Sequence, residues 1–297
     1  MNVLSLFNGM SFCSMALESL GVNVNKMYSS EIDKYANQAT QAMFPDTIQL
    51  GDVTQWREWD IDWASIDLVT GGFPCQAWSM AGKQLGDKDE RGMLFWTMLD
   101  IMKHVRYHNP KADFLIENVK MKKEFEQYIT THTENALGQV YKILINSALV
   151  SAQNRNRYYW TSFKVEQPEN TSANWGSARE WAVDDKYYYS EAAFNWLSNH
   201  AKKKEKDLTI YTTSGKMQML EASHFKNYSA QRFFGVLDHK GIRYVTPREC
   251  FRLQTVPERH IDTLLSAGIS NTQLYKMCGN GWTMEVIKHI FKALAIN

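Results

Sequence analysis

The feature that most constrains this chain is a regular alternation of strand-like and helix-like segments, which continues as far as Phe163. Short apolar, β-branched stretches are each followed by a longer stretch with apolar residues at helical spacing. Because parallel strands need helical crossovers, the alternation predicts a doubly wound, Rossmann-like α/β sheet. The predicted strands are residues 2–7, 24–31, 66–70, 112–119, 140–150 and 157–163, and the predicted helices are residues 14–20, 34–43, 92–105 and 122–137.

The character of the sequence changes after Phe163. Residues 165–240 are polar and aromatic with weak periodicity, which predicts a small, mostly irregular or β domain. Helical patterns return from Tyr244, where Thr246 and Pro247 suit an N-cap and a first helical position. The sequence therefore predicts a main domain over residues 1–164, a second domain over 165–240, and a return to the main domain over 241–297.

Composition excludes several classes of protein. The 297 residues, 44% of them hydrophobic, can bury a sizeable core. No run of eighteen apolar residues occurs, and the opening MNVLSLFNG lacks the features of a signal peptide, so we expect a cytoplasmic protein with no membrane partner. Four scattered cysteines without a CxxC pair predict neither a disulfide framework nor a metal site.

Charge is distributed unevenly along the chain. Residues 1–100 hold six Lys or Arg against thirteen Asp or Glu, whereas residues 200–243 hold nine against four. This segregation predicts an acidic and a basic surface with separate roles. The alternative is a solvated surface whose charge is uneven by chance.

One cysteine follows a predicted strand directly, in the stretch GGFPCQAWS, residues 71–79. Open α/β sheets bind ligands beyond the carboxyl ends of their strands, so Cys75 lies where a reactive group would be useful. Pro74 fixes its own φ, and the two glycines allow close approaches of the backbone. The alternative is a small buried residue in a turn.

Acidic residues follow other predicted strands. Glu31 lies 22 residues after Gly9, at a spacing that suits a carboxylate on a ribose, although a GxGxxG loop is absent. Asp52, in the stretch GDV, suits a purine amino group. An exposed loop carboxylate is the alternative for each of them.

A second group of candidates lies further along the chain. Glu117 and Asn118 end a strand of buried residues, where a carboxyl group can hold and donate a proton. Arg155 and Arg157, in QNRNR, lie on one face if the segment is extended, and could grip a carbonyl, a phosphate or Glu117. A structural glutamate and a basic hairpin edge are the alternatives.

The order and spacing of these elements are more specific than any one of them. Across nearly the whole chain they resemble the DNA (cytosine-5) methyltransferase family, with residues 165–240 at the place of its variable target-recognition region. The compact length and the opening LSLFNGMS are most similar to phage or prophage enzymes. The motifs that carry the resemblance are LFNG, GDV, GGFPCQAWS, DERGMLFW, LIENV, QNRNR, TPRECFRLQ and GNGW.

The resemblance implies a catalytic role for four residues. Cys75 would attack C6 of a cytosine that is flipped out of double-stranded DNA, and Glu117 would contact N3 of that base. Arg157 would hold the base carbonyl, and Arg155 would steady the Cys75 loop. The resemblance also implies a catalytic domain over 1–164 and an enzyme that acts as a monomer.

The resemblance further implies S-adenosylmethionine as methyl donor, with S-adenosylhomocysteine as product. Phe7 would lie against the adenine, Glu31 would hold the ribose and Asp52 the adenine amino group. Two departures concern this pocket: the loop NGMSFCSM holds less glycine than the family's, and Trp282 is bulkier than usual. The implied cofactor residues are Phe7, Gly9, Met10, Glu31, Ile32, Asp52, Val53, Phe73, Asn280 and Trp282.

Charge and resemblance together predict where DNA is contacted. The predicted contacts are Gln76, Ser79, Lys83, Arg91, Lys202, Lys203, Lys204 and Arg232, with Lys216, Lys226 and Arg243 as the next candidates. Alternatives are an RNA cytosine-5 methyltransferase, a catalytically inactive DNA-binding relative, and a Rossmann oxidoreductase. The last would need a second nearby cysteine and a GxGxxG loop, and the sequence has neither.

Overall fold

The computed structural model describes residues 1–74, 90–203, 208–224, 226 and 234–294. These residues form two compact units that the chain enters more than once. The first unit comprises Met1–Asn146, Asn156–Pro168 and Val286–Asn297, and the second comprises Ser147–Arg155 and Glu169–Glu285. Each unit is described by itself below.

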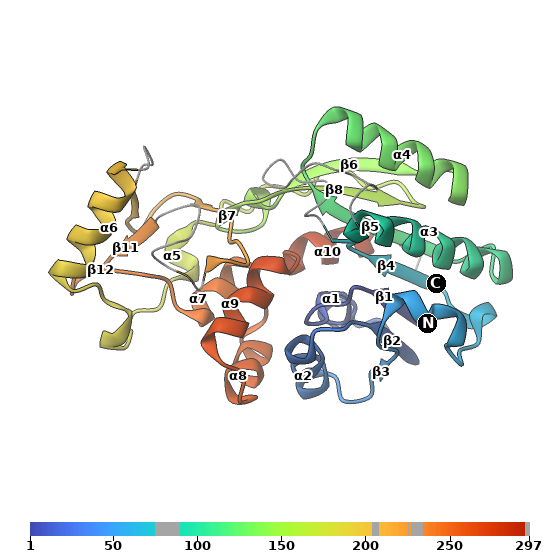
Figure 1. Ribbon diagram of the computed structural model, residues 1–297, viewed down its shortest axis with the longest axis horizontal. Coiled ribbons are helices and arrows are strands. Elements are labelled where there is room, and N and C mark those ends of the chain that lie inside the picture. Colours follow the sequence, from blue (N-terminus) through green and yellow to red (C-terminus); the bar gives the residue numbers. More distant parts are fainter. Residues whose placement is uncertain (75–89, 204–207, 225, 227–233, 295–297) are drawn as a thin grey trace. The chain divides into compact units, whose positions relative to one another are not determined.

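The first unit is built on a seven-stranded sheet in the order β3-β2-β1-β4-β5-β8-β6 (Figure 1). Strands β1 to β5 are mutually parallel, β8 pairs antiparallel with β5, and β6 pairs antiparallel with β8. The order reverses between β1 and β4, and open α/β sheets bind ligands at such a switch point. The strands are β1 (Asn2–Leu6), β2 (Lys26–Ser30), β3 (Ile48–Gln49), β4 (Leu68–Gly71), β5 (Asp113–Val119), β6 (Tyr141–Asn146) and β8 (Asn156–Thr161).

Alternate residues of the central strands form one face of the core. Leu4, Leu6 and Val69 join a buried cluster with Phe95 and Met98, because side chains two apart on a strand point the same way. At Gly71 the end of β4 comes close to the helix that contains Met98. A Cβ added at this glycine would lie 2.7 Å from the sulfur of Met98. The helices of this unit are α1 (Phe12–Ser19), α2 (Lys34–Met43), α3 (Glu90–His108), α4 (Lys123–Leu137) and most of α10 (Met284–Phe291), with 3₁₀ turns η1 (Val53–Glu58) and η2 (Trp63–Ser65).

The second unit combines two small sheets with several helices. Strand β7 pairs with β10, and β9, β11 and β12 form a three-stranded sheet. Helix α7 begins with a capping box between Thr246 and Glu249, with Pro247 in its first turn. The elements are η5 (Ser147–Leu149), β7 (Gln153–Asn154), α5 (Trp175–Ala178), η6 (Asp185–Tyr187), α6 (Glu191–Lys203), β9 (Thr209–Tyr211), β10 (Met217–Gln218), β11 (Phe234–Leu237), β12 (Ile242–Arg243), α7 (Pro247–Leu253), α8 (Glu258–Ser266) and α9 (Asn271–Asn280).

The doubly wound α/β sheet that the sequence predicted is confirmed, with most strand bounds shifted by one or two residues. The 13-residue helix α6 was not predicted, and few of its side chains are buried. The compact units also divide the chain elsewhere than at residues 164 and 240, since α7 to α9 belong to the second unit. The functional domains drawn from the resemblance stay a prediction. Among the residues described, no helix is both long and apolar enough to cross a membrane.

Candidate active site

The loop between β1 and α1 turns with left-handed backbone at Phe7, Gly9 and Ser11, whose φ values are 54°, 56° and 67°. Such a conformation costs a non-glycine residue roughly 1–2 kcal/mol. Buried hydrogen bonds offset this cost: Asn8 Nδ2 donates to Ser11 Oγ at 2.9 Å, and Ser11 Oγ lies 2.8 Å from Thr40 Oγ1. Side chains thus hold a turn for which the sequence offers few glycines.

Glu31 follows β2 and reaches back to this loop. Its Oε2 accepts the main-chain N–H of Gly9 at 2.9 Å, and its Oε1 accepts those of Ile32 and Asp33, both at 2.8 Å. A carboxylate offers about four acceptor positions. With three of them taken, Glu31 can accept one further hydroxyl, and it also fixes the loop.

The other predicted cofactor residues of the first unit lie in the segments that follow β1, β2, β3 and β4. Asp52 caps η1 by accepting the N–H of Thr54 at 2.8 Å. An added Cβ at Gly9 would meet no atom of the described residues within 4 Å, so open space adjoins the loop. Ile32 is 77% exposed, whereas Met10, Val53 and Phe73 are buried.

Glu117 and Arg157 form an ion pair at neighbouring strand ends. Arg157 Nε lies 3.0 Å from Glu117 Oε1, and the two side chains are 9% and 11% exposed. Strands β5 and β8 bring them together, with Val119 opposite Arg157 and Glu117 opposite Tyr159. The pair is nearly buried, and about a tenth of each side chain remains accessible to a ligand.

Asn118 connects this strand end to the segment that leads to Cys75. Its Nδ2 donates to the main-chain carbonyl of Phe73 at 3.0 Å, inside the protein. Phe73 is itself buried against Phe95, with ring centroids 5.0 Å apart. Asn118 therefore holds the backbone two residues before Cys75 against the strand that carries Glu117, although Cys75 itself lies outside the described residues.

Comparison with known proteins identifies the family of this chain. The family model of the C-5 cytosine-specific DNA methylases matches residues 1–220 and 180–295. The chain belongs to this family. It is thus a DNA cytosine-5 methyltransferase, a class whose members use S-adenosylmethionine as methyl donor.

Individual relatives cover most of the chain. Type II methyltransferase M1.ScrFI of Lactococcus lactis subsp. cremoris is 33% identical over 90% of the chain and 71% of its own length. Type II methyltransferase M.SsoII of Shigella sonnei is 32% identical over 90% of the chain and 73% of its own length. The solved structure of Entamoeba histolytica methyltransferase EhMeth has a TM-score of 0.77 at 18% identity, over 99% of this chain and 97% of that one, and supports the fold alone.

The family's QNRNR motif is divided between the two units of this methyltransferase. Arg157 belongs to the first unit, while Arg155 belongs to the second. There Arg155 donates to the main-chain carbonyls of Leu220, Gly279 and Gly281. Its predicted support of the Cys75 loop concerns a segment outside the described residues and stays a prediction. The same holds for contacts of Asn280 and Trp282 with the cofactor, since both belong to the second unit.

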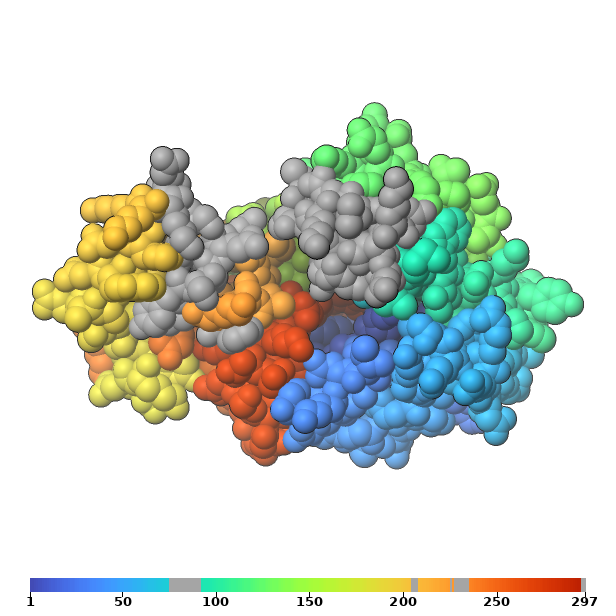
Figure 2. Space-filling view, viewed as in Figure 1, coloured from blue at the N-terminus to red at the C-terminus, as the bar shows by residue number. Residues whose placement is uncertain are grey.

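Only part of the predicted DNA-contacting set can be placed. Lys202 and Lys203 are exposed in the last turn of α6, which lies on the surface in yellow in Figure 2. Arg243 was a wrong candidate, because its side chain is fully buried in ion pairs with Asp238 and Glu249. The predicted contacts Gln76, Ser79, Lys83, Lys204 and Arg232 lie outside the described residues, as does the side chain of Arg91.

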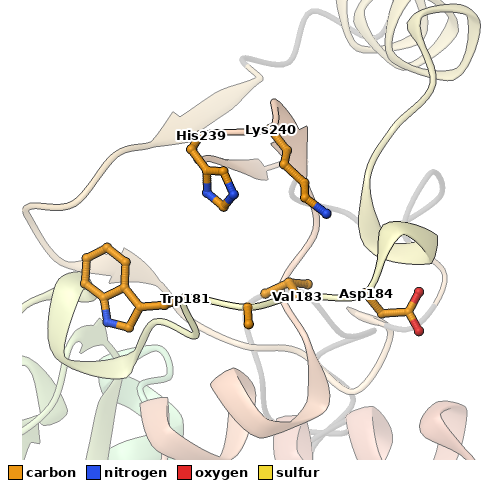
Figure 3. A pocket seen from close by; sticks show the side chains of 6 residues that line it. Trp181, Val183, Asp184, His239 and Lys240 are labelled. Atoms are coloured by element: carbon orange, nitrogen blue, oxygen red, sulfur yellow. The ribbon is translucent and has the colours of Figure 1, made fainter.

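The second unit also has a shallow groove of about 360 Å³ that the sequence did not indicate. Trp181, Val183 and Asp184 line one side, and His239 and Lys240, from the turn between β11 and β12, line the other (Figure 3). Lys240 Nζ forms an ion pair with Asp185 at 2.7 Å. Of the predicted site residues that the structure describes, none lines this groove.

Sequence reasoning missed the residues that support the site. Ser11 and Thr40 are fully buried, and a hydrogen bond between these residues, 29 positions apart, stabilises the loop between β1 and α1. No local pattern could have shown this bond. The only signal in the sequence was the small number of glycines in the loop NGMSFCSM, since a loop poor in glycine needs some other support.

Proposed function

We propose that this enzyme transfers a methyl group from S-adenosylmethionine to C5 of a cytosine flipped out of double-stranded DNA. The proposal includes a covalent bond between Cys75 and C6 of the base. The observation that supports it most is the Glu117–Arg157 pair, on the strand whose Asn118 holds the backbone leading to Cys75. This grouping puts an acid, a cation and the approach to a thiol at one edge of the sheet.

The other cysteines are poor nucleophiles by comparison. Cys13, Cys250 and Cys278 are all buried. Burial raises the pKa of Cys13 to about 12, despite a hydrogen bond with Thr70 that lowers it, and burial also raises the pKa of Cys250. Since the thiolate is the reactive form, these thiols are unsuited to attack a base. Cys75 therefore remains the best candidate.

The proposed roles follow the chemistry of cytosine. C5 is a weak nucleophile until a thiolate adds to C6, which turns the ring into an enamine-like species. Glu117 contacts N3 and Arg157 the base carbonyl, where negative charge develops as the thiolate adds. C5 then takes the methyl group and loses its proton, and the C6–sulfur bond breaks to restore both ring and thiolate. Flipping the base costs about a few kcal/mol, which the site's contacts must offset.

The loops of the first unit fit the methyl donor. Glu31 has an acceptor position for a ribose hydroxyl, Asp52 suits the adenine amino group, and Ile32 offers apolar surface. Phe7, Gly9, Met10, Val53 and Phe73 would complete these walls, with Asn280 and Trp282 from the second unit. When bound, the donor supplies an electrophilic methyl group on a sulfonium.

We further propose that residues 165–240 recognise the DNA target and that the enzyme acts as a monomer. Lys202 and Lys203 support this through their exposure at the end of α6, where they could touch phosphates. Lys204, Arg232, Lys83 and Arg91 would extend the basic contact, with Gln76 and Ser79 beside the flipped base. The alternative for the lysines is a helix terminus solvated by water, where cations are also favourable.

A mechanism-based trap tests the proposal directly. A duplex with 5-fluorocytosine in the target should stay covalently attached to the enzyme, because C5 then has no removable proton. We expect the adduct at Cys75, and none with Cys75→Ser, which should still bind S-adenosylhomocysteine. An adduct at Cys13, Cys250 or Cys278 would contradict the assignment. Methylation of tRNA in place of duplex DNA would favour the RNA enzyme.

A further inference from the structure

The second unit contains a buried cluster of polar side chains that the proposed chemistry does not use. Gln153, Arg155, Gln254 and Thr283 are each at most 2% exposed. Buried polar groups are costly unless they are hydrogen-bonded, so their partners indicate what the cluster is for. These residues come from three motifs that are far apart in the sequence: QNRNR, TPRECFRLQ and the stretch that follows GNGW.

Arg155 lies between β7 and β8 and joins parts of the chain that are remote in the sequence. One terminal nitrogen, Nη1, donates to the carbonyl of Leu220 at 3.0 Å. The other, Nη2, donates to the carbonyls of Gly279 at 3.0 Å and Gly281 at 2.7 Å. A guanidinium suits this task because its planar fork holds several acceptors in a fixed geometry. Asn280 lies between the two carbonyls that Nη2 holds.

Gln254 supports the same turn from a second direction. Its Nε2 donates to the carbonyl of Cys278 at 2.7 Å, and its Oε1 accepts from Gln153 Nε2 at 2.9 Å. Thr283 Oγ1 also donates to Gln254 Oε1, at 3.0 Å. The turn from Cys278 to Thr283 is thus held at three carbonyls and one side chain.

Close packing adds to these hydrogen bonds at Gly279. A Cβ added there would lie 2.2 Å from the carbonyl carbon of Glu221 and 2.4 Å from the nitrogen of Ala222. No side chain fits in that position, so the end of α9 lies directly against the backbone after β10. Arg155 binds the chain on both sides of this contact, at Leu220 and at Gly281.

We propose that Arg155 is a positioning residue for the turn Cys278–Thr283, and that it sets the affinity for S-adenosylmethionine rather than the rate of methyl transfer. Gln153 and Gln254 act with it. The inference rests on the proposed function, which assigns Asn280 and Trp282 of this turn to the methyl donor. It gives the arginines of QNRNR different roles, with Arg157 acting on the base and Arg155 on the turn.

The test compares Arg155→Met with the matched control Tyr275→Phe. Tyr275 lies on the same helix, and its hydroxyl donates to the carbonyl of Val245 at 2.6 Å, away from the turn. We expect Arg155→Met to raise the KM for S-adenosylmethionine and the Kd for S-adenosylhomocysteine by about 10- to 100-fold. The kcat at saturating donor should change by no more than about threefold. The control should change neither constant by more than about twofold.

Hydrogen exchange of the cofactor-free enzyme gives a second readout, which does not depend on the proposed function. Peptides covering residues 278–285 should exchange faster in Arg155→Met than in Tyr275→Phe. If Arg155→Met fails to fold, Arg155→Lys replaces it, since one ammonium cannot reproduce both arms of the fork, and the same shifts are expected at smaller size.

The outcomes separate the two proposals. A wild-type enzyme that binds no S-adenosylhomocysteine contradicts the proposed function, while exchange of the turn still tests the positioning role. The inference is overturned if residues 278–285 exchange at the same rate in Arg155→Met as in Tyr275→Phe. It is also overturned if they exchange faster while the affinity for S-adenosylhomocysteine stays unchanged. A fall in kcat at constant KM also overturns it, and would assign Arg155 to the Cys75 loop instead.

Discussion

Each unit of the molecule holds a glutamate–arginine ion pair, and the two pairs differ in what they leave exposed. In the second unit, Arg243 and Glu249 form two bonds, of 2.8 and 2.7 Å, and both side chains are completely buried. In the first unit, Arg157 reaches Glu117 through Nε at 3.0 Å, and about a tenth of each side chain is exposed.

The surroundings of the two pairs explain the difference. Arg243 also binds Asp238, and Glu249 accepts the main-chain N–H groups of Thr246 and Glu180. Burial alone would raise the pKa of Asp238, but hydrogen bonds from Tyr188 and Arg243 outweigh it and lower the pKa to about 2. The second pair is therefore built into a closed network that fixes a helix start. The first lies at the ends of strands, where we propose that a base reaches it. Exposure, and not residue type, therefore separates the structural pair from the pair that we propose to be catalytic.

We expect the largest effect from a substitution in the partly accessible pair Glu117–Arg157. Glu117→Gln keeps the shape of the side chain but removes the charge that faces Arg157 and the group that we propose shares a proton with N3. We expect kcat for duplex methylation to fall by about 10²- to 10⁴-fold, the range for loss of a general acid. Single-turnover assays measure this, with S-adenosylhomocysteine affinity as the control, which should stay unchanged. An enzyme that keeps more than a tenth of its activity would show that Glu117 is a structural residue.

For the buried pair Arg243–Glu249 we expect a substitution to lower the stability of the fold. Glu249→Gln leaves Arg243 with one carboxylate and weakens the cap of α7, so we expect the free energy of unfolding to fall by about 3–5 kcal/mol. Urea unfolding followed by circular dichroism measures it. The matched control is Glu258→Gln, which removes a half-exposed partner of Arg248 and Arg252 and should cost about 0–1 kcal/mol. If both variants lost the same free energy of unfolding, burial would not determine how much these ion pairs contribute to stability.

The same contrast explains what could be predicted from the sequence. In the first unit, periodicity predicted α2 over its full length and the strand that ends in Glu117 and Asn118, because local patterns of apolar residues determine those elements. Motif order then indicated the family. The strand ends that carry the candidate site could therefore be named before the structure was known.

The second unit was less predictable because its contacts are long-range. Gln153 and Gln254 are 101 residues apart, and hydrogen bonds of this kind leave no periodic trace. Helix α6 escaped notice since only Leu197 and Ala201 of its side chains are buried. Arg243 was taken for a surface cation, because a positive charge in a basic stretch does not reveal that its carboxylate partners are buried with it.

The smallest of the three expected effects concerns Glu31. Main-chain N–H groups hold this carboxylate, whereas arginines hold Glu117 and Glu249. Glutamine in its place has one acceptor oxygen and a donor NH₂ group, so it cannot serve Gly9 on one side and both Ile32 and Asp33 on the other. Glu31→Gln should weaken S-adenosylhomocysteine binding by about 1.5–3 kcal/mol, the worth of a charge-assisted hydrogen bond. Calorimetry measures this, and Asp33→Asn is the control, since it keeps an N-cap for α2 two residues away. Equal affinities in the wild type and Glu31→Gln would place Glu31 outside the cofactor site. A loss confined to Glu31→Gln would show that this carboxylate is available to a ligand, because its main-chain partners leave one acceptor position open.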